Sequence, residues 1–260
     1  MNKYTQTYFI TNDCMDINYK LTPIGAVMLF QDCFAQYMTT EHVAAFDVIS
    51  DNIYWVVAEL NMEFTAEMPF WSEKIDVSVW VSEVAKLRMY ADFELSHNGK
   101  VFAKGNSCWF ILSTETRRPL PIKLIADKFE ICEEFTLGEH KKFSLSEEKE
   151  AIKTITHKTN LSDIDFNNHV NNKSYINIAN ATLDKDFKLT HFLKKMNVKF
   201  MKEAFIDEVL TCTTYRTDDS NTFIHKIEKD GDAVCDISTV WELKGEQTEI
   251  STYPLQIRSF

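Results

Sequence analysis

The stretch Ser162–Tyr175, SDIDFNNHVNNKSY, combines carboxylates, carboxamides and one imidazole, and an apolar, helix-capable run follows it directly. Asp and Asn are unfavourable inside helices but favoured at helix entrances, because their side chains accept hydrogen bonds from free backbone N–H groups. The stretch therefore predicts a polar loop that leads into the N-terminus of a helix. Such a terminus carries partial positive charge and unpaired N–H donors, which suit a substrate oxygen that becomes negative during a reaction.

Three side chains of this loop are candidates for chemistry. Asp165, Asn167 and His169 are spaced i, i+2 and i+4, and no glycine or proline marks the segment as an ordinary turn. The structural alternative is an Asx-rich turn, which is common, with an Asp–His pair that serves only to hold the loop. We treat the three residues as a candidate catalytic group.

Composition bounds the class of protein. The chain has 260 residues, 45% of them hydrophobic and 26% charged, which is typical of one large or two small globular domains with a sizeable core. A formal net charge of −11 argues against a general nucleic-acid binder, because neutralising phosphates needs a cationic face.

Cysteine usage and the lack of targeting segments predict a soluble, intracellular protein. No cysteine belongs to a CxxC pair or another metal-binding spacing, so we expect reduced thiols in the core. The N-terminus lacks a basic-then-apolar signal pattern, and no apolar run is long enough to span a bilayer. The cysteines are Cys14, Cys33, Cys108, Cys132, Cys212 and Cys235.

The first half predicts one buried helix and a set of long strands. Residues 8–17 are compatible with a strand, and Thr22-Pro23 supplies an N-cap and a first-position proline for a helix over Ile24–Tyr37. Since this helix is apolar on nearly every side, it needs a structure wrapped around it. Four segments rich in Val, Phe, Tyr and Trp read as antiparallel strands, with a hairpin turn at Asn98-Gly99. These strands are Ile53–Thr65, Ile75–Val84, Leu87–Ser96 and Val101–Ser113.

The second half repeats the first, after a charged connection over Pro119–Glu150. Four matches occur in the same order, which favours duplication over chance and predicts two related α+β modules, residues 1–145 and 146–260. The matches are Asp16–Lys20 with Asp165–His169, Glu59–Phe64 with Lys195–Phe200, Ile75–Val81 with Val209–Tyr215, and Gly99–Trp109 with Gly231–Trp241. The first copy has Lys20 where the second has His169, so only the second keeps a side chain that titrates near neutral pH. We predict one catalytic and one non-catalytic module.

A helix wrapped by a long antiparallel sheet is the hot-dog architecture, and the sequence resembles the acyl-ACP thioesterase family of plants and bacteria. DIDFNNHVNNKSYINIA (Asp163–Ala179) is similar to the family run D-x-D-x-N-x-H-V-N-N-x-x-Y, and VKFMKEA (Val198–Ala204) resembles the strand that ends in a catalytic glutamate. NIYWVVAEL (Asn52–Leu60) and WSEKIDVSVWV (Trp71–Val81) resemble strands of the first module. The resemblance implies a double hot-dog fold and hydrolysis of fatty acyl-ACP to free fatty acid and ACP.

Residue by residue, the resemblance places the family's catalytic positions on Asp165, Asn167, His169 and Glu203. Ala204 stands where plant members have a cysteine, which excludes a cysteine nucleophile there, and Glu59 stands where many relatives have arginine. From the chemistry, either carboxylate can be the base or nucleophile, while the carboxamide and imidazole orient water or the thioester carbonyl. The sequence does not choose between the two carboxylates.

The resemblance also sets expectations for location and partners. No transit peptide is seen, so we expect a bacterial, cytoplasmic member that needs neither cofactor nor metal. ACP is the expected carrier partner, with no nucleic acid and no membrane, and the oligomeric state stays open, a homodimer being one option. ACP is acidic, so cationic residues should gather where it docks. The candidates are Lys86, Arg88, Arg117, Arg118, Lys194, Lys195, Lys199 and Lys202.

The nearly all-apolar first helix predicts that the first module holds the acyl chain. The expected contacts are Val27, Met28, Phe30, Phe34 and Val57.

Three alternatives remain beside this assignment. A hot-dog hydratase is disfavoured, because its motif carries a proline and places histidine five residues after the aspartate, whereas His169 comes four after Asp165. An acyl-CoA thioesterase performs the same chemistry on a different carrier. A non-catalytic acyl-binding protein explains the phenylalanine-rich core but not the polar group in the second module.

Overall fold

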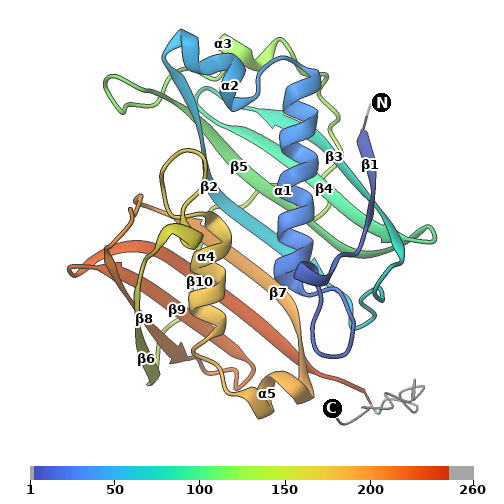
Figure 1. Cartoon of the computed structure of the whole chain (residues 1–260), viewed down its shortest axis with the longest axis vertical. Helices are drawn as coiled ribbons and strands as arrows, with labels where there is room; N and C mark the ends of the chain where they lie inside the picture. Colours follow the sequence, from blue (N-terminus) through green and yellow to red (C-terminus); the bar gives the residue numbers. More distant parts are fainter. Residues whose placement is uncertain (1–2, 246–260) are drawn as a thin grey trace, which may run out of the picture.

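The computed structural model describes residues 3–245, and it contains one ten-stranded antiparallel sheet with two long helices, α1 and α4, lying across the same face (Figure 1). The strand order is β1-β3-β4-β5-β2-β7-β10-β9-β8-β6, so the first five strands and the last five form two halves of one sheet. The predicted double hot-dog is confirmed. The sequence did not indicate that the two sheets join edge to edge.

The strands are β1 (Tyr4–Phe9), β2 (Ile53–Phe64), β3 (Lys74–Val84), β4 (Met89–His97), β5 (Lys100–Ser113), β6 (Ala151–Lys158), β7 (His191–Phe200), β8 (Val209–Arg216), β9 (Thr222–Lys229) and β10 (Asp232–Leu243). The α-helices are α1 (Pro23–Thr40), α2 (Ala45–Val48), α3 (Lys123–Ala126), α4 (Asn172–Asn180) and α5 (Lys185–Thr190), and the 3-10 helices are η1 (Asn12–Cys14), η2 (Ile49–Asp51) and η3 (Leu161–Asp163).

The two halves meet at β2 and β7, which pair antiparallel with Asn61 opposite Asn197. These asparagines are also equivalent in the repeat, so the two copies are related by an approximate two-fold axis through this pair. On one side of this pair Glu59 lies opposite Lys199, and on the other side Glu63 lies opposite Lys195 with their Oε1 and Nζ atoms 2.6 Å apart. The duplicated strands have therefore diverged into opposite charges that face each other across the seam.

Within the repeat, one of the sequence matches is wrong by one residue. The structure pairs Val79 with Phe93 in the first module and Thr214 with His225 in the second. Phe93 and His225 stand at the same distance before the hairpin glycines, so Val79 corresponds to Thr214 and the match should run one residue later. The match was misaligned because polar and apolar residues alternate in both segments, so the pattern alone does not fix their alignment. A shift of one residue exchanges the two faces of a strand.

The start of the chain contains a second correction. The expected strand over residues 8–17 is wrong: β1 ends at Phe9, and the chain turns through η1 into a loop closed by a bridge between Met15 and Leu21. Backbone hydrogen bonds inside this loop replace strand pairing, among them the Asp16 N–H to the Lys20 carbonyl at 2.8 Å. Alternation alone cannot distinguish such a loop from a strand.

Helix α1 begins as predicted. The Thr22 side chain accepts a hydrogen bond from the Gly25 N–H, and Pro23 is the first helical residue. The helix is buried on most but not all sides, because Asp32, Ala35 and Gln36 are exposed. The expectation that it is buried on nearly every side holds only for the face toward the sheet.

The hairpin turn predicted at Asn98-Gly99 is confirmed, and Asp230-Gly231 makes the same turn at the matching place in the second copy. The φ angles are 50° and 76° at Asn98 and Gly99, and 52° and 83° at Asp230 and Gly231. Two consecutive positive φ values define the tight turn that matches the twist of paired strands.

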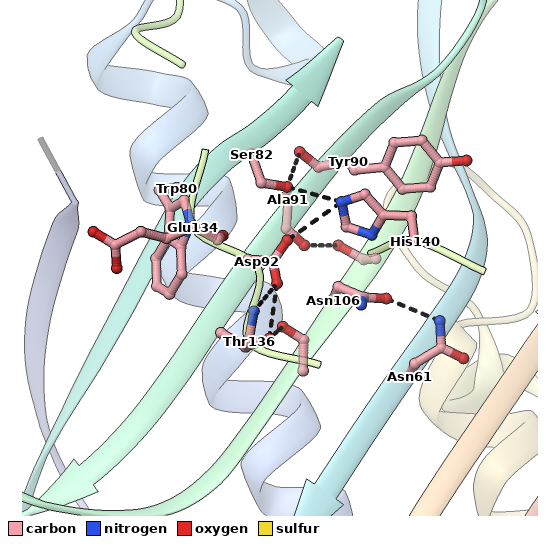
Figure 2. Close-up of polar contacts among 12 residues, drawn as sticks. Asn61, Trp80, Ser82, Tyr90, Ala91, Asp92, Asn106, Glu134, Thr136 and His140 are labelled. Atoms are coloured by element: carbon pink, nitrogen blue, oxygen red, sulfur yellow. Dashed lines mark hydrogen bonds and ion pairs between the residues drawn. The ribbon is translucent and has the colours of Figure 1, made fainter. Parts of the chain in front are cut away.

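The connection between the halves crosses the outer face of the first-module sheet (Figure 2). Asp92 on β4 is fully buried there, and its Oδ1 accepts hydrogen bonds from the Thr136 N–H at 2.7 Å and the Thr136 hydroxyl at 2.8 Å. His140 Nε2 lies 3.1 Å from Ser82 Oγ and 3.5 Å from Asp92 Oδ2, and burial lowers the pKa of this imidazole. The short structure expected in the connection is present as α3.

All six cysteine side chains are free and buried, as the sequence predicts. Across residues 3–245, the structure has no helix with both the length and the apolar character needed to cross a membrane.

Candidate functional site

The loop before α4 is organised by the carboxylate of Asp165. Its Oδ1 accepts the backbone N–H of Asn167 at 2.8 Å and of His169 at 3.4 Å, and the Asp165 N–H donates to the His169 carbonyl at 2.9 Å. Asn168 adopts a φ of 63°, the left-handed conformation that asparagine tolerates better than most residues. The i, i+2, i+4 spacing is therefore the spacing of an Asx turn, and it aligns three polar residues in a fixed loop.

Glu203 reaches this loop from the connection between β7 and β8. The Val170 N–H donates to the Ala204 carbonyl at 2.8 Å, which holds the two segments side by side. As a result, His169 Nδ1 lies 3.3 Å from Glu203 Oε1, and the side chains are only 19% and 28% exposed. Phe205 covers the imidazole edge-on, with ring centroids 5.2 Å apart. The structure brings together two of the four predicted residues in direct contact.

The two other predicted residues occupy different places. Asp165 is half-buried, and its contacts are the backbone bonds of the loop. Asn167 is exposed, and its side chain makes no hydrogen bond with residues 3–245, so its amide is available to a ligand.

Arg117 completes the site from the other module, and the sequence assigned it only to carrier docking. It follows β5 in a turn with a φ of 58°, forms an ion pair with Glu203 Oε2, and lies 5.0 Å above the Tyr54 ring. Burial, then the charge of Glu203, raises the pKa of the Tyr54 phenol. Arg117 and Glu203 lie 86 residues apart, so the sequence could not indicate that they form a pair. The only sequence signal for a role of Arg117 in this site was its position in a polar turn just after a buried strand.

Most backbone N–H groups at the start of the helix after this loop, which were expected to face a substrate, donate hydrogen bonds within the protein instead. Helix α4 begins at Asn172, and the N–H groups of residues 170, 171, 173 and 174 all donate to other protein atoms. Asn171 caps the helix by accepting from the Lys173 N–H at 3.0 Å. Of these first positions, only the Asn172 N–H remains for a developing oxyanion.

The chemical capacity of the site is that of a carboxylate base beside an imidazole, with an amide donor nearby. A carboxylate and an imidazole within hydrogen-bonding reach can move a proton between water and a leaving group. Within residues 3–245, no three His, Cys, Asp or Glu side chains lie close enough together to hold a metal ion.

The residues expected to hold the acyl chain occupy two environments. Val27, Phe30, Phe34 and Val57 are buried in the core, where Phe30 stacks on Phe93 with centroids 3.7 Å apart. Met28 alone of the five lines a cavity of about 1640 Å³, which lies between the loops of the first module and the helix α4 with its sheet.

Seven of the eight candidate docking cations separate into two groups, and the eighth, Lys199, is half-buried with its Nζ 5.7 Å from the centre of the Phe143 ring. Arg117, Lys194, Lys195 and Lys202 form ion pairs with Glu203, Glu242, Glu63 and Asp232. Lys86, Arg88 and Arg118 are exposed, and none of them forms an ion pair with residues 3–245. These three lie near one end of the β4–β5 pair, where Arg88 sits 5.6 Å from the Phe110 ring and Leu112 bridges to Pro119.

Comparison with known proteins places these features in context. The model of the acyl-ACP thioesterase N-terminal domain matches residues 1–131, and that of the acyl-ACP thioesterase C-terminal domain matches residues 146–243. A palmitoyl-acyl carrier protein thioesterase of Gossypium hirsutum is 27% identical over 68% of the chain and 44% of its own length. An oleoyl-acyl carrier protein thioesterase of Coriandrum sativum is 23% identical over 68% and 51%. The chain thus spans about half the length of these curated relatives.

Solved structures agree in fold. An acyl-ACP thioesterase from Bacteroides thetaiotaomicron superposes with a TM-score of 0.80 at 24% identity, covering 92% of this chain and 97% of that one. The 12:0-ACP thioesterase from Umbellularia californica gives 0.82 at 19% identity, covering 93% and 98%.

Proposed function

The chain belongs to the acyl-ACP thioesterase family, and we propose that it hydrolyses the thioester of fatty acyl-ACP to a free fatty acid and ACP, in fatty acid biosynthesis. The observation that carries this proposal is the contact between His169 and Glu203, which sets an imidazole 3.3 Å from a carboxylate at the loop that the family motif occupies. Family membership supports the substrate class.

In the proposed reaction Glu203 is the general base. It takes a proton from a water molecule whose oxygen attacks the thioester carbonyl carbon, and the carbonyl oxygen becomes an oxyanion. The exposed amide of Asn167 and the Asn172 N–H are the donors that would stabilise this oxyanion. The carbon–sulfur bond then breaks, and the proton passes through His169 to the sulfur of the carrier.

Asp165 takes the role of organiser in this proposal. One of its oxygens already holds two backbone N–H groups, so its carboxylate fixes the loop that presents His169 and Asn167. Arg117 orients Glu203 through Oε2 and leaves Oε1 toward the imidazole. A direct attack by the Glu203 carboxylate is a second route to the same products.

The acyl chain would lie in the first module. The reacting groups border Tyr54 on β2, and Val57 lies three residues further along the same strand. The chain would have to displace the buried side chains of Val27, Phe30 and Phe34 between α1 and the sheet. Each buried methylene stabilises binding by about 0.8 kcal/mol, so the room gained there would set the preferred chain length.

For the carrier, the exposed cations Lys86, Arg88 and Arg118 are better docking residues than Lys194 and Lys195, whose charges are already paired. A patch of unpaired cations attracts an acidic partner in a protein of net charge −11.

The proposal is tested by incubating the purified chain with acyl-ACP and acyl-CoA that carry the same acyl group. We expect release of free fatty acid from both, with a higher kcat/KM for acyl-ACP. A higher value for acyl-CoA would make the acyl-CoA thioesterase the correct assignment. Tight acyl-ACP binding without release would make the protein a non-catalytic binder.

A further inference from the structure

The ion pair between Arg117 and Glu203 lies partly in solvent. The two side chains are 50% and 28% exposed. An exposed pair of this kind usually stabilises a structure little, because two long side chains lose rotamer freedom and water screens their charges. The proposed reaction nevertheless needs one orientation of Glu203, with Oε1 held 3.3 Å from His169 Nδ1. A further contact is therefore needed to keep the arginine in place.

The backbone of Arg117 supplies part of this restraint. Its φ of 58° lies in the left-handed region, which is unfavourable for a residue with a side chain. The turn is closed by two hydrogen bonds, from the Arg117 N–H to the Ser113 carbonyl at 2.9 Å and from the Ser113 N–H to the Arg118 carbonyl at 3.0 Å. Strained residues persist only where the surrounding structure imposes them, and they are frequent at functional sites. This turn sends the Arg117 side chain to the second module.

The ring of Tyr54 supplies the rest. The guanidinium carbon of Arg117 lies over this ring, 5.0 Å from its centre. Trp55 and Val57 belong to the core, so alternation along β2 places Tyr54 on the opposite face of the strand, where it is still only 8% exposed. A guanidinium within about 6 Å of an aromatic face is attracted by the ring, and more strongly when water is excluded. The contact therefore disfavours conformers in which Arg117 turns into solvent.

The internal repeat shows that this ring belongs to one copy. Strands β2 and β7 are equivalent, with Asn61 matching Asn197, so Tyr54 matches Thr190. Thr190 has no ring, and its hydroxyl donates to the Asp186 carbonyl at 2.9 Å. Of the two matching strand positions, the aromatic one is thus the position that borders the proposed catalytic glutamate.

We propose that Tyr54 is a positioning residue, whose ring holds Arg117 in the orientation that fixes Oε2 of Glu203. Oε1 of the same carboxylate then stays toward His169. The inference rests on the proposed function, because it assigns a role in the same site. Through this relay a strand of the first module sets the geometry of the base that the second module supplies.

Steady-state kinetics on acyl-ACP test the role of the ring. Tyr54→Leu should lower kcat roughly tenfold, the effect of losing a partly desolvated cation–π contact, and change KM little. Tyr54→Phe keeps the ring and should regain most of the kcat that Tyr54→Leu loses. Phe9→Leu is the matched control, because it removes a comparable contact on β1, where Lys74 Nζ lies 5.1 Å from the Phe9 ring. This control should keep the wild-type kcat.

A double-mutant cycle tests whether Tyr54 acts through Arg117. In the Arg117→Gln background, Tyr54→Leu should change kcat by less than about twofold. A tenfold loss in both backgrounds would overturn the proposal. Arg117→Lys gives a second test that leaves Tyr54 intact, since it keeps the charge but not the planar group that stacks on the ring. It should lose about as much kcat as Tyr54→Leu, and wild-type kcat in Arg117→Lys would also overturn the proposal.

A spectroscopic measurement separates this inference from the proposed function. In the ¹⁵N-labelled protein, the Arg117 Nε–H resonance is the one absent from Arg117→Gln. The ring current of Tyr54 acts on it, so it should be displaced in Tyr54→Leu and unchanged in Phe9→Leu. An undisplaced resonance in Tyr54→Leu would overturn the inference even if the wild type is active. A displaced resonance in a chain that cleaves no thioester would refute the proposed function and leave the Tyr54–Arg117 contact standing.

Discussion

The loops before α1 and before α4 have the same backbone and different chemistry. Asp16 Oδ1 accepts the N–H of Asn18 at 2.8 Å and of Lys20 at 3.1 Å, which repeats the bonds that Asp165 makes to residues 167 and 169. Tyr19 and Asn168 have φ angles of 61° and 63°. The Asx turn is thus a scaffold common to both copies, and it does not itself distinguish the copy that we propose is catalytic.

The difference lies in what each loop faces. His169 contacts Glu203, which is 28% exposed and is also paired with Arg117 of the other module. In the first copy Glu67 is 76% exposed and pairs with Lys100 of its own module, while Lys20 borders the cavity. The proposed catalytic group therefore depends on a contact between modules, the Arg117–Glu203 ion pair, whereas the matching Glu67 is paired within its own module.

The largest expected effect on kcat comes from removing either side chain of the His169–Glu203 contact. Glu203→Gln and His169→Ala should each lower kcat for acyl-ACP by roughly 10²–10⁴-fold, the usual loss for a general base, while substrate binding persists. Glu67→Gln, at the matching place in the first copy, should leave kcat near the wild-type value. Steady-state kinetics on the three variants decide the matter, and wild-type turnover by Glu203→Gln would refute the site.

The second effect concerns the cores of the two copies, where Phe93 corresponds to His225. His225 is fully buried among the hydroxyls of Thr182, Thr214 and Thr239, and burial lowers its pKa to about 3. The unfolded chain binds a proton below about pH 6.5 and the folded chain does not, so the free energy of unfolding should fall as pH decreases from there toward 3. The slope from this group alone is about 1.4 kcal/mol per pH unit.

Urea unfolding at several pH values measures this slope. His225→Gln should show a shallower decrease between pH 6 and 4.5 than wild type, whatever its stability at pH 7. The same slope in both proteins would mean that His225 does not titrate with unfolding.

The third effect concerns KM for acyl-ACP, and it compares the cations of the first module that form no ion pair with the paired cations on β7. Charge reversal of Lys86, Arg88 and Arg118 together should raise KM for acyl-ACP by about tenfold at low salt, because each reversal repels the acidic carrier. Turnover of a small thioester without a carrier should not change. Lys194→Glu serves as the control, and a larger KM effect there than in the triple variant would return the docking site to the seam.

The smallest expected effect on kcat concerns the Asx turn that Asp165 holds in the loop before α4. Asp165→Asn keeps an oxygen that can accept the same two backbone N–H groups, so kcat should fall by less than about tenfold if the residue only organises the loop. Asp165→Ala removes the acceptor and should reduce activity much further. A thousandfold loss in Asp165→Asn would instead make this carboxylate a direct participant in the chemistry.

The sequence by itself determined the local features of this protein. The Thr22 and Asn171 caps, the two hairpin turns and the Asx-turn spacing are each set by residues within a few positions of one another, so their chemistry is legible in the chain. The duplication was visible for the same reason, since copied local patterns remain recognisable, although alternation could not fix the register of Ile75–Val81.

Only the tertiary structure decided the features that join distant residues. The pairing of β2 with β7 creates the seam, and the Arg117–Glu203 contact depends on how the two modules meet, which neither segment specifies alone. The placement of hollow space was also hidden. An apolar α1 suggested a cavity in the first module, but packing depends on whether side chains from helix and sheet meet. Phe30 and Phe93 do meet, with ring centroids 3.7 Å apart, and neither segment by itself records that contact.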